Sequence, residues 1–470
     1  MSETFFEPLS AMDRQFLEME GPNAPMHVSG VSEYELGPLR SEPGSLDFGR
    51  VREAIESVLD RIPIYRQRLA WTPIEGRPGW IDDPGFELDY HLRQVALPAP
   101  GNESQLKELT ALIVSQPLDR ARPLWEMWFI EGLDGGENFA VVTKMHHCMI
   151  DGGSGANLMS LLMRASPDHK SATPKAWTPR PAPTGLALAA GEIEQRVSTP
   201  LRWLRGARRF QAQNRSLPGA LLDRAAALRD ILSHALPAST TPINGPLGRH
   251  RRVDWMETSL EDLTSLRRKV GCSLNDLALT VVTGALRRYL TGRGVEVDGL
   301  DFRVSVPVNV RREDEREKMG NRISSWILRL PLELAEPMEQ LGVIRQRTGE
   351  ARESKQALGM EMIMAAAEEL PLLLTLAAWA NRGQINCVVT NIPGPPIPLY
   401  FVGCRVRTMQ PFVLLPPGVG LTVALLSYDG RLFWGFMADY DRVSDLGRFR
   451  DDVRDSLTAV QEAVTLAPAS

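Results

Sequence analysis

The fold of this chain is decided by one short stretch of sequence, His146-His147-Cys148-Met149-Ile150-Asp151-Gly152-Gly153. The preceding residues, 139–145, are apolar and rich in β-branched side chains, which is typical of a strand. The residues that follow the stretch, from about 154 to 164, have a helical pattern. The two histidines are therefore predicted to lie in a glycine-rich turn between a strand and a helix, where side chains can be directed into a cleft.

A histidine in such a turn could act as a general base. The ordinary pKa of imidazole lies near neutrality, so the ring can accept a proton from an alcohol and return it later. The chain contains only seven histidines, and two of them are adjacent here. Asp151 could hold the turn or orient a ring, while Gly152 and Gly153 let the backbone turn sharply and leave room for a substrate.

Three other interpretations of the stretch stay open. Zinc needs about three or four suitably spaced ligands, whereas adjacent histidines on an extended chain point to opposite faces and no partner pattern is evident. The run at 152–156 nearly matches the G-x-S-x-G elbow of serine hydrolases, but it ends in alanine and its histidine precedes the serine. A structural histidine pair, satisfied within the turn, is the third alternative.

The composition favours a soluble chain with two domains. Its 470 residues exceed one ordinary core, and hydrophobic residues make up 43% and charged residues 24%. The net charge of −5 argues against a dedicated nucleic-acid binder, although a local basic pocket could still hold phosphates. Four widely spaced cysteines favour reduced thiols in a cytosol. The first residues do not have the pattern of a signal peptide.

Helices and strands are predicted in both halves of the chain. Ser10 is a candidate cap for a first helix, and another helix is expected over 47–62. In the second half we expect a helix over 273–290, strands over 302–308 and 323–330, and a hairpin between apolar runs at 419–427 and 432–437. Asp429-Gly430 joins these two runs and favours a tight turn.

The composition also changes along the chain, and it suggests an N-terminal domain over 1–165, a linker over 166–250 and a C-terminal domain over 251–470. The linker carries six arginines and no acid between Arg196 and Arg215. This basic run is either a solvated helix face or a contact with an anionic membrane or lipid-droplet surface. Residues 358–380 are apolar, but charges and a proline interrupt them, which favours a buried or interfacial helix pair over a membrane span.

Several motifs together resemble the bacterial wax ester synthase/diacylglycerol acyltransferase family, part of the CoA-dependent acyltransferase superfamily with its H-H-x-x-x-D-G pattern. Besides His146–Gly152, the resemblance is carried by Pro8-Leu9-Ser10 with Asp13, Phe16 and Leu17, by Pro25-Met26-His27, by Pro117-Leu118-Asp119-Arg120 and Arg122-Pro123-Leu124-Trp125-Glu126, by Asn275-Asp276, by Thr390-Asn391-Ile392-Pro393-Gly394-Pro395, and by Ser427-Tyr428 with Gly430 and Asp439. It covers roughly residues 8–162 and 250–450.

The resemblance implies an α/β fold of mixed sheets, arranged as two chloramphenicol-acetyltransferase-like domains with a cleft or channel between them. Within the H-H-x-x-x-D-G motif it implies His147 as the general base beside His146. It further implies Asp151 as a structural anchor and Gly152 as a residue that keeps the substrate channel open.

The resemblance extends to four residues outside that motif. Asn275 could polarise or position the reacting groups. Trp125 would form packing or channel wall. Asn391 and Gly394 would form either a turn of fixed geometry or part of the substrate channel.

The implied activity is transfer of an acyl group from acyl-CoA to diacylglycerol or a long-chain alcohol. Acyl-CoA is the co-substrate, and neither a metal nor another cofactor is expected. The implied partners are these substrates and a peripheral membrane or lipid-droplet surface, without nucleic acid. The expected location is the cytoplasm, at the inner face of the membrane or at lipid inclusions.

Two alternatives from other classes remain. One is a condensation-type enzyme that uses carrier-bound acyl groups, against which the Asn275-Asp276 element argues. The other is a non-catalytic lipid-binding or lipid-droplet protein.

Overall fold

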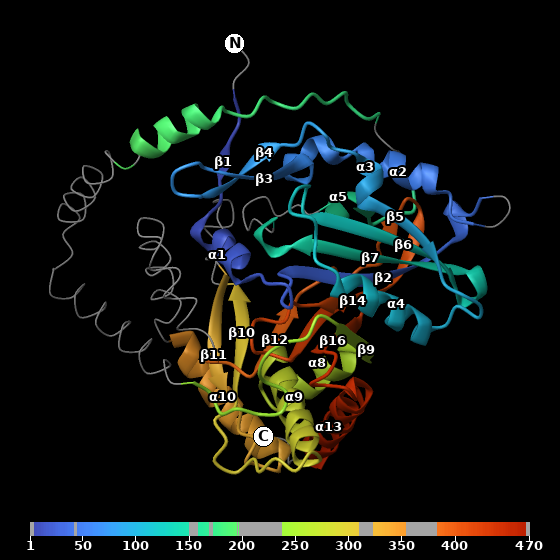
Figure 1. Ribbon diagram of the computed structural model, residues 1–470. Coiled ribbons are helices and arrows are strands. Elements are labelled where there is room, and N and C mark those ends of the chain that lie inside the picture. Colours follow the sequence, from blue (N-terminus) through green and yellow to red (C-terminus); the bar gives the residue numbers. More distant parts are fainter. Residues whose placement is uncertain are drawn as a thin grey trace, which may run out of the picture.

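Two large mixed β-sheets, one in each half of the chain, form the frame of the molecule (Figure 1). The computed structural model describes residues 4–41, 45–149, 158–168, 173–194, 196, 237–309, 323–353 and 383–466. This arrangement confirms the predicted α/β fold with mixed sheets in two parts.

The N-terminal sheet has seven strands in the order β5-β6-β7-β2-β14-β13-β8. Their bounds are β2 His27–Glu35, β5 Leu92–Ala96, β6 Trp125–Leu133, β7 Asn138–His146, β8 Met163–Arg164, β13 Tyr400–Phe401 and β14 Cys404–Phe412. Strands β13 and β14 come from the C-terminal part of the chain. Strand β14 pairs antiparallel with β2, from Phe412 opposite Ser29 to Val406 opposite Tyr34. The N-terminal sheet is thus completed by residues more than 350 positions later in the sequence.

Smaller elements surround this sheet in the upper part of Figure 1. They are β1 Glu7–Pro8, α1 Ala11–Met19, α2 Phe48–Glu56, β3 Gln67–Trp71, β4 Pro78–Asp82, α3 Leu88–His91, α4 Glu103–Ser115 and α5 Leu158–Leu162, with 3₁₀ turns at Gly37–Leu39, Leu59–Arg61, Pro63–Arg66, Asp134–Gly136 and His147–Met149. Residues 173–184 run along the small β1-β4-β3 sheet, where Arg180 forms a salt bridge with Asp82 at 2.7 Å. A helix over 185–194 follows.

The C-terminal sheet has six strands in the order β11-β10-β12-β15-β16-β9. Their bounds are β9 Arg251–Ser259, β10 Arg303–Asn309, β11 Ile323–Arg329, β12 Cys387–Ile392, β15 Leu421–Tyr428 and β16 Arg431–Asp439. Four helices, α8 Leu260–Lys269, α9 Leu274–Thr291, α10 Pro337–Glu353 and α13 Leu446–Leu466, pack below this sheet in Figure 1 and share one apolar core with it. The other side of the sheet is left to face the N-terminal half.

Local sequence signals account for several boundaries. The Ser10 side chain caps α1 by accepting from the Asp13 N–H at 3.1 Å, as predicted. The hairpin between β15 and β16 turns through Asp429 and Gly430, both at positive φ (46° and 76°), which confirms the predicted tight turn. The predicted helix over 47–62 is too long, because α2 ends at Glu56 and two 3₁₀ turns follow before β3.

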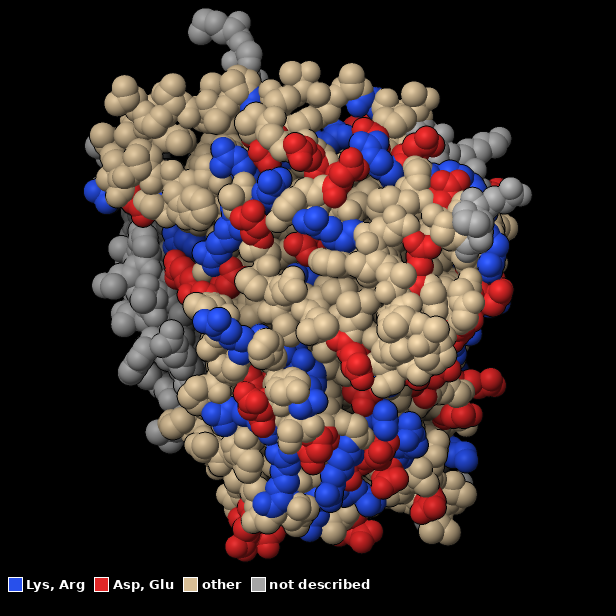
Figure 2. Space-filling model, turned by 45° about the vertical axis from the view of Figure 1, so that its right-hand side comes forward, with Lys and Arg blue, Asp and Glu red and all other residues tan. Residues whose placement is uncertain are grey.

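The two halves meet along α4 and β9. Lys107 of α4 forms a salt bridge with Asp254 of β9 at 2.7 Å, and its ammonium lies 4.8 Å from the centre of the Trp255 ring. Basic and acidic side chains are interleaved over the face shown in Figure 2, so charge on that face is not gathered into one patch.

Three predicted features lie outside the described residues. They are Asp151 and Gly152 in the histidine motif, the basic run beyond Arg196, and the apolar segment 358–380. Among the residues that the structure does describe, no helix is both long enough and apolar enough to cross a membrane.

Candidate functional site

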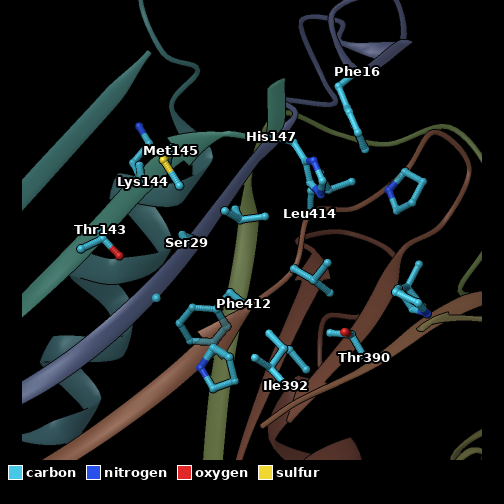
Figure 3. A pocket seen from close by; sticks show the side chains of 18 of the residues that line it. Phe16, Ser29, Thr143, Lys144, Met145, His147, Thr390, Ile392, Phe412 and Leu414 are labelled. Carbon is cyan, nitrogen blue, oxygen red and sulfur yellow. The ribbon is translucent and has the colours of Figure 1, made fainter. Parts of the chain in front are cut away.

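A cavity of about 750 Å³ lies between the two halves. Its walls come from α1, β2, β6, β7 and β14 on one side and from β10, β11, β12 and β15 on the other. The lining is mostly apolar and contains several methionines. In Figure 3, His147 lies between Thr143 and Met145 of β7 on one side and Thr390 and Ile392 of β12 on the other. The predicted general base therefore faces a cavity built by both halves.

His147 is placed by the end of β7 and by α1. Its backbone N–H donates to the Met26 carbonyl at 2.8 Å. Its ring stacks on Phe16 of α1, with ring centres 3.8 Å apart and an angle of 19° between the planes. Phe16 also lines the cavity (Figure 3). A flat apolar ring thus covers one face of the imidazole and fixes its orientation.

The surroundings of His147 favour its neutral form. Burial lowers the pKa of the ring to about 4, because the imidazolium loses solvation. A hydrogen bond with the residue's own backbone raises the pKa, and the nearby His146 lowers it. The buried Nδ1 of His147 has no hydrogen-bond partner within the described part of the chain. At neutral pH the ring is therefore present as a free base, which is the form that accepts a proton.

His146 lies on the other side of the backbone, away from the cavity, and is almost fully buried. Its Nδ1 accepts from the Cys148 N–H at 3.1 Å, which holds the turn that follows β7. Its Nε2 lies 3.4 Å from Oε1 of Glu20. Burial raises the pKa of the Cys148 thiol, so this cysteine is a protonated packing residue rather than a nucleophile. We refer to His146–Met149 as the histidine turn.

Glu20 was not predicted from the sequence. Its carboxylate accepts from the Met26 N–H at 3.1 Å and from Nε of Arg120 at 2.7 Å. Burial would raise its pKa, but the contacts with His146, Met26 and Arg120 outweigh this effect and lower the pKa to about 2. Glu20 is therefore a carboxylate that ties α1 to the histidine turn. No local signal could have found it, because Arg120 lies 100 positions further along the chain.

Trp125, predicted as packing or channel wall, does line the cavity. Its indole Nε1 donates to the Tyr65 carbonyl at 2.9 Å, and His91 stacks on its other side with ring centres 4.5 Å apart. The hydroxyl of Tyr65 lies 3.2 Å from the sulfur of Met145. These contacts make Trp125 a fixed part of the cavity wall.

Asn275 and Asp276 open α9, and their side chains have different surroundings. Asp276 completes a capping box with Ser273 and accepts from the Thr348 hydroxyl of α10 at 2.7 Å. It is buried and joins two helices of the C-terminal core. Asn275 is half-buried and is not among the residues that line the cavity.

Asn391 and Gly394, the predicted residues of the segment Thr390–Pro395 (the late motif), do not line the cavity either, although their neighbours do. Strand β12 directs Thr390 and Ile392 toward the cavity, so Asn391 between them points to the opposite side. Gly394 lies against β15, where a Cβ atom would come within 2.1 Å of the Ser427 carbonyl oxygen. The close approach of two chain segments therefore accounts for Gly394.

Family models match most of the chain. The model for the wax ester synthase/diacylglycerol acyltransferase catalytic domain matches residues 9–278, and the model for the C-terminal domain of the same family matches residues 319–461. Two curated relatives come from Mycobacterium tuberculosis strain H37Rv. The chain is 32% identical to "Probable diacyglycerol O-acyltransferase tgs1" over 96% of this chain and 94% of that protein. It is 33% identical to Rv1760, a protein named for the same activity, over 97% of this chain and 90% of that protein.

Solved structures show a similar fold. The wax ester synthase/diacylglycerol acyltransferase of Marinobacter aquaeolei VT8 is 24% identical and aligns with a TM-score of 0.67, over 98% of this chain and all of that one. The first condensation domain of the CDA synthetase is 17% identical and aligns with a TM-score of 0.60, over 99% and 97% of the two chains. At these identities the two structures support the two-part architecture alone.

Proposed function

The chain belongs to the wax ester synthase/diacylglycerol acyltransferase family and is an acyl-CoA-dependent acyltransferase, and we propose that His147 is its general base for esterifying diacylglycerol, a long-chain alcohol, or both. The observation that carries the proposal is a neutral imidazole held at the wall of a largely apolar cavity between the two halves. Such a cavity suits the hydrocarbon parts of both substrates, while the imidazole supplies the one group that must take a proton.

The reaction would run in two steps at His147. The imidazole removes the proton of the acceptor hydroxyl while its oxygen attacks the thioester carbonyl, and a tetrahedral intermediate forms. Collapse of the intermediate expels the CoA thiolate, which the imidazolium reprotonates. Because burial holds the His147 pKa at about 4, the imidazolium is a strong acid and returns its proton readily. The products are an oxygen ester and free CoA.

The negative oxygen of the intermediate requires a hydrogen-bond donor, and we keep Asn275, which the resemblance implies, as the proposed donor although it lies outside the cavity lining. It is an amide in the first turn of α9, where the helix dipole favours negative charge. Removal of such a donor costs about 10²–10³ in kcat, so Asn275→Ala should show a loss of that size. An unchanged kcat in Asn275→Ala would remove this residue from the mechanism.

The cavity wall gives little basis for choosing between the two acceptors. Each methylene group that enters an apolar environment contributes only about 0.8 kcal/mol, so lipids that differ by a few methylenes are poorly discriminated. We therefore propose activity toward both diacylglycerol and long-chain alcohols.

The test is release of free thiol from palmitoyl-CoA by purified protein, with either diacylglycerol or hexadecanol as acceptor. We expect acceptor-dependent release that is lost in His147→Ala. The matched control is His250→Ala, because His250 is an exposed histidine outside the cavity lining. Release that persists in His147→Ala would show that another group is the base. No release by the wild type with either acceptor would favour carrier-bound substrates or a non-catalytic lipid-binding protein.

We also propose that one end of the N-terminal half contacts a membrane or lipid-droplet surface from the cytoplasmic side. Trp71 and Ile74, at the turn between β3 and β4, are each 48% exposed, and Ile193 on the adjacent helix is 54% exposed. Glu192 joins the two segments, because it accepts from the Ile74 N–H at 2.9 Å. The exposed Arg196 opens the basic run of the sequence, which would suit anionic lipids.

This surface can be tested by flotation with vesicles that contain anionic phospholipid. We expect the wild type to float and the double variant Trp71→Ser, Ile193→Ser to float less. Leu112→Ser is the control, because Leu112 is 60% exposed but lies on α4. Equal flotation of all three proteins, or none by the wild type, would contradict the proposed surface.

A further inference from the structure

Gly30 lies in the middle of β2, and its backbone does not require glycine. Its φ is not in the left-handed region, and the pairing of β2 with β7 is regular on both sides of it. Glycine weakens a strand, so an interior glycine usually marks a bulge or a close approach of another group. Gly30 sits at no bulge, which leaves close approach as the explanation.

The other strand glycines in the described chain have visible reasons. Gly132 has a φ of 82° and lies at an irregularity in β6. A Cβ atom on Gly79 would lie 2.3 Å from the Phe6 ring, and one on Gly435 would lie 1.7 Å from the Pro411 carbonyl oxygen. In each case the backbone or a packed neighbour excludes a side chain.

At Gly30 one backbone atom approaches in the same way, but less closely, so a side chain needs only a small shift of β14. A Cβ atom there would be 3.2 Å from the Gln410 carbonyl oxygen and 3.9 Å from Oγ1 of Thr143, with no other atom within 4 Å. Gly30 lines the cavity. Apart from the Gln410 oxygen, the space beside Gly30 among the described residues is the cavity itself.

The residues around Gly30 form a trough on the same face of the sheet. Gly30 is directly opposite Thr143 on β7 and Pro411 on β14, and directly opposite residues of antiparallel strands point to one face. Ser32, two positions further along β2, also lines the cavity. The trough thus has a floor of small residues, Gly30 and Ser32, and walls from the two neighbouring strands.

The trough leads away from the reacting centre. His27, at the start of β2, pairs with His146. Gly30 lies three residues further on, which is about 10 Å along a strand. A long hydrocarbon chain whose reacting carbon is beside His147 would pass over Gly30, while a short one would end before it.

We propose that Gly30 sets the length of the hydrocarbon chain that this branch of the cavity accepts. The inference rests on the proposed function and deepens it. The shared chemistry is a linear alkyl chain, which could belong to the acyl-CoA or to the alcohol. A side chain at this position would fill the trough and exclude the far end of a long chain, without touching the reacting groups.

The experiment compares wild type, Gly30→Ala and Gly30→Val in two substrate series. In the first, acyl-CoA varies from octanoyl to hexadecanoyl with one acceptor. In the second, the alcohol varies over the same lengths with one acyl-CoA. We expect Gly30→Val to lower kcat/KM for the longest chains of one series by at least ~10-fold relative to the shortest, because it would displace two or more methylene groups, each worth about fourfold. The affected series identifies which substrate occupies the trough.

A second variant keeps the proposal testable if Gly30→Val does not fold. Ser32→Leu should narrow the same trough further from His147, so only the longest chains should be affected. Equal losses at all lengths in both series, or unchanged length profiles in all variants, would overturn the proposal. No turnover by the wild type with any chain would instead contradict the proposed function, so the two failures are distinguishable.

Discussion

Nε2 of His146 lies 3.4 Å from Oε1 of Glu20, on the side of the backbone opposite to the cavity. Through this contact the histidine turn is anchored to α1, the same helix whose Phe16 stacks on His147. The Glu20 carboxylate is held in turn by Arg120. Glu20 is thus a positioning residue: it does not face the cavity, but it fixes the neighbour of the base.

Replacing Glu20 should therefore impair catalysis more than substrate binding. Glu20→Ala leaves His146 and Arg120 without their carboxylate, so the histidine turn can shift. Because a displacement of about 1 Å can cost ~10²-fold in rate, we expect kcat to fall by about 10–100-fold while KM for acyl-CoA changes little. Steady-state kinetics with palmitoyl-CoA measures both constants.

Two further variants separate positioning from general stability. Glu20→Gln keeps an oxygen that can accept hydrogen bonds, so it should recover part of the lost kcat. Glu108→Ala removes an exposed glutamate of α4 and should leave kcat unchanged. If Glu20→Ala lowers the melting temperature while kcat of the folded enzyme stays at the wild-type value, the residue has only a structural role.

The burial of His147 should be visible in the pH profile. The unprotonated ring is the active form and its pKa is about 4, so kcat/KM should be constant through neutral pH and fall only as pH falls toward 4. Phe16→Ala exposes the ring to water, which should raise its pKa toward 6.5 and move the acid limb to higher pH. Phe16→Leu keeps an apolar cover and should shift the limb less. A wild-type acid limb near pH 6.5 would contradict a desolvated base.

Buried histidines should also make the fold sensitive to acid. Burial lowers the pKa of His27 to about 3, against an ordinary value of 6.5. Below pH 6.5 His27 therefore binds a proton in the unfolded chain but not in the folded chain. The free energy of unfolding falls as the pH is lowered from 6.5 toward 3. The slope contributed by His27 is about 1.4 kcal/mol per pH unit. Urea unfolding at pH 5 and pH 7 should show a larger loss in the free energy of unfolding for the wild type than for His27→Gln. Identical pH dependence in both proteins would contradict this role of His27.

The late motif should contribute to stability through the close packing of Gly394 against β15. Gly394→Ala places a Cβ atom 2.1 Å from the Ser427 carbonyl oxygen, so the segment that follows β12 must move away from β15 locally. We expect a loss of about 1–3 kcal/mol in the free energy of unfolding. Asn391→Ala, on the half-buried side of β12, should change stability by no more than about 0.5 kcal/mol. Urea titration of both variants measures this difference, and equal stabilities would show that the segment adjusts without cost.

Much of the fold could be predicted because its signals are local. A serine before a helix and an aspartate-glycine pair between two apolar runs act within a few residues, so Ser10 and Asp429 placed a helix start and a hairpin correctly. The position of His147 between strand and helix signals was equally local. The predicted helix over 47–62 was too long because the local signal does not mark where α2 ends. The apolar stripe continues through the 3₁₀ turns that follow.

The remaining features depend on contacts between distant segments. The Glu20–Arg120 pair and the joining of β14 to β2 link residues that no periodicity connects. A family motif also does not say which of its residues does what. In Asn275-Asp276, the structure shows that Asp276 is engaged by Ser273 and Thr348, a distinction that requires the side-chain environment of α9.

The insertion of β14 into the N-terminal sheet has a consequence for the order of events during synthesis. While the chain emerges from the ribosome, β2 keeps an unpaired edge until residue 412 has been made, and an open edge of this kind invites association with other chains. A fragment that stops after the first half would keep that edge permanently. The first half cannot complete its sheet early and wait for the second, so the last steps of folding must assemble the two halves, and the cavity between them, together.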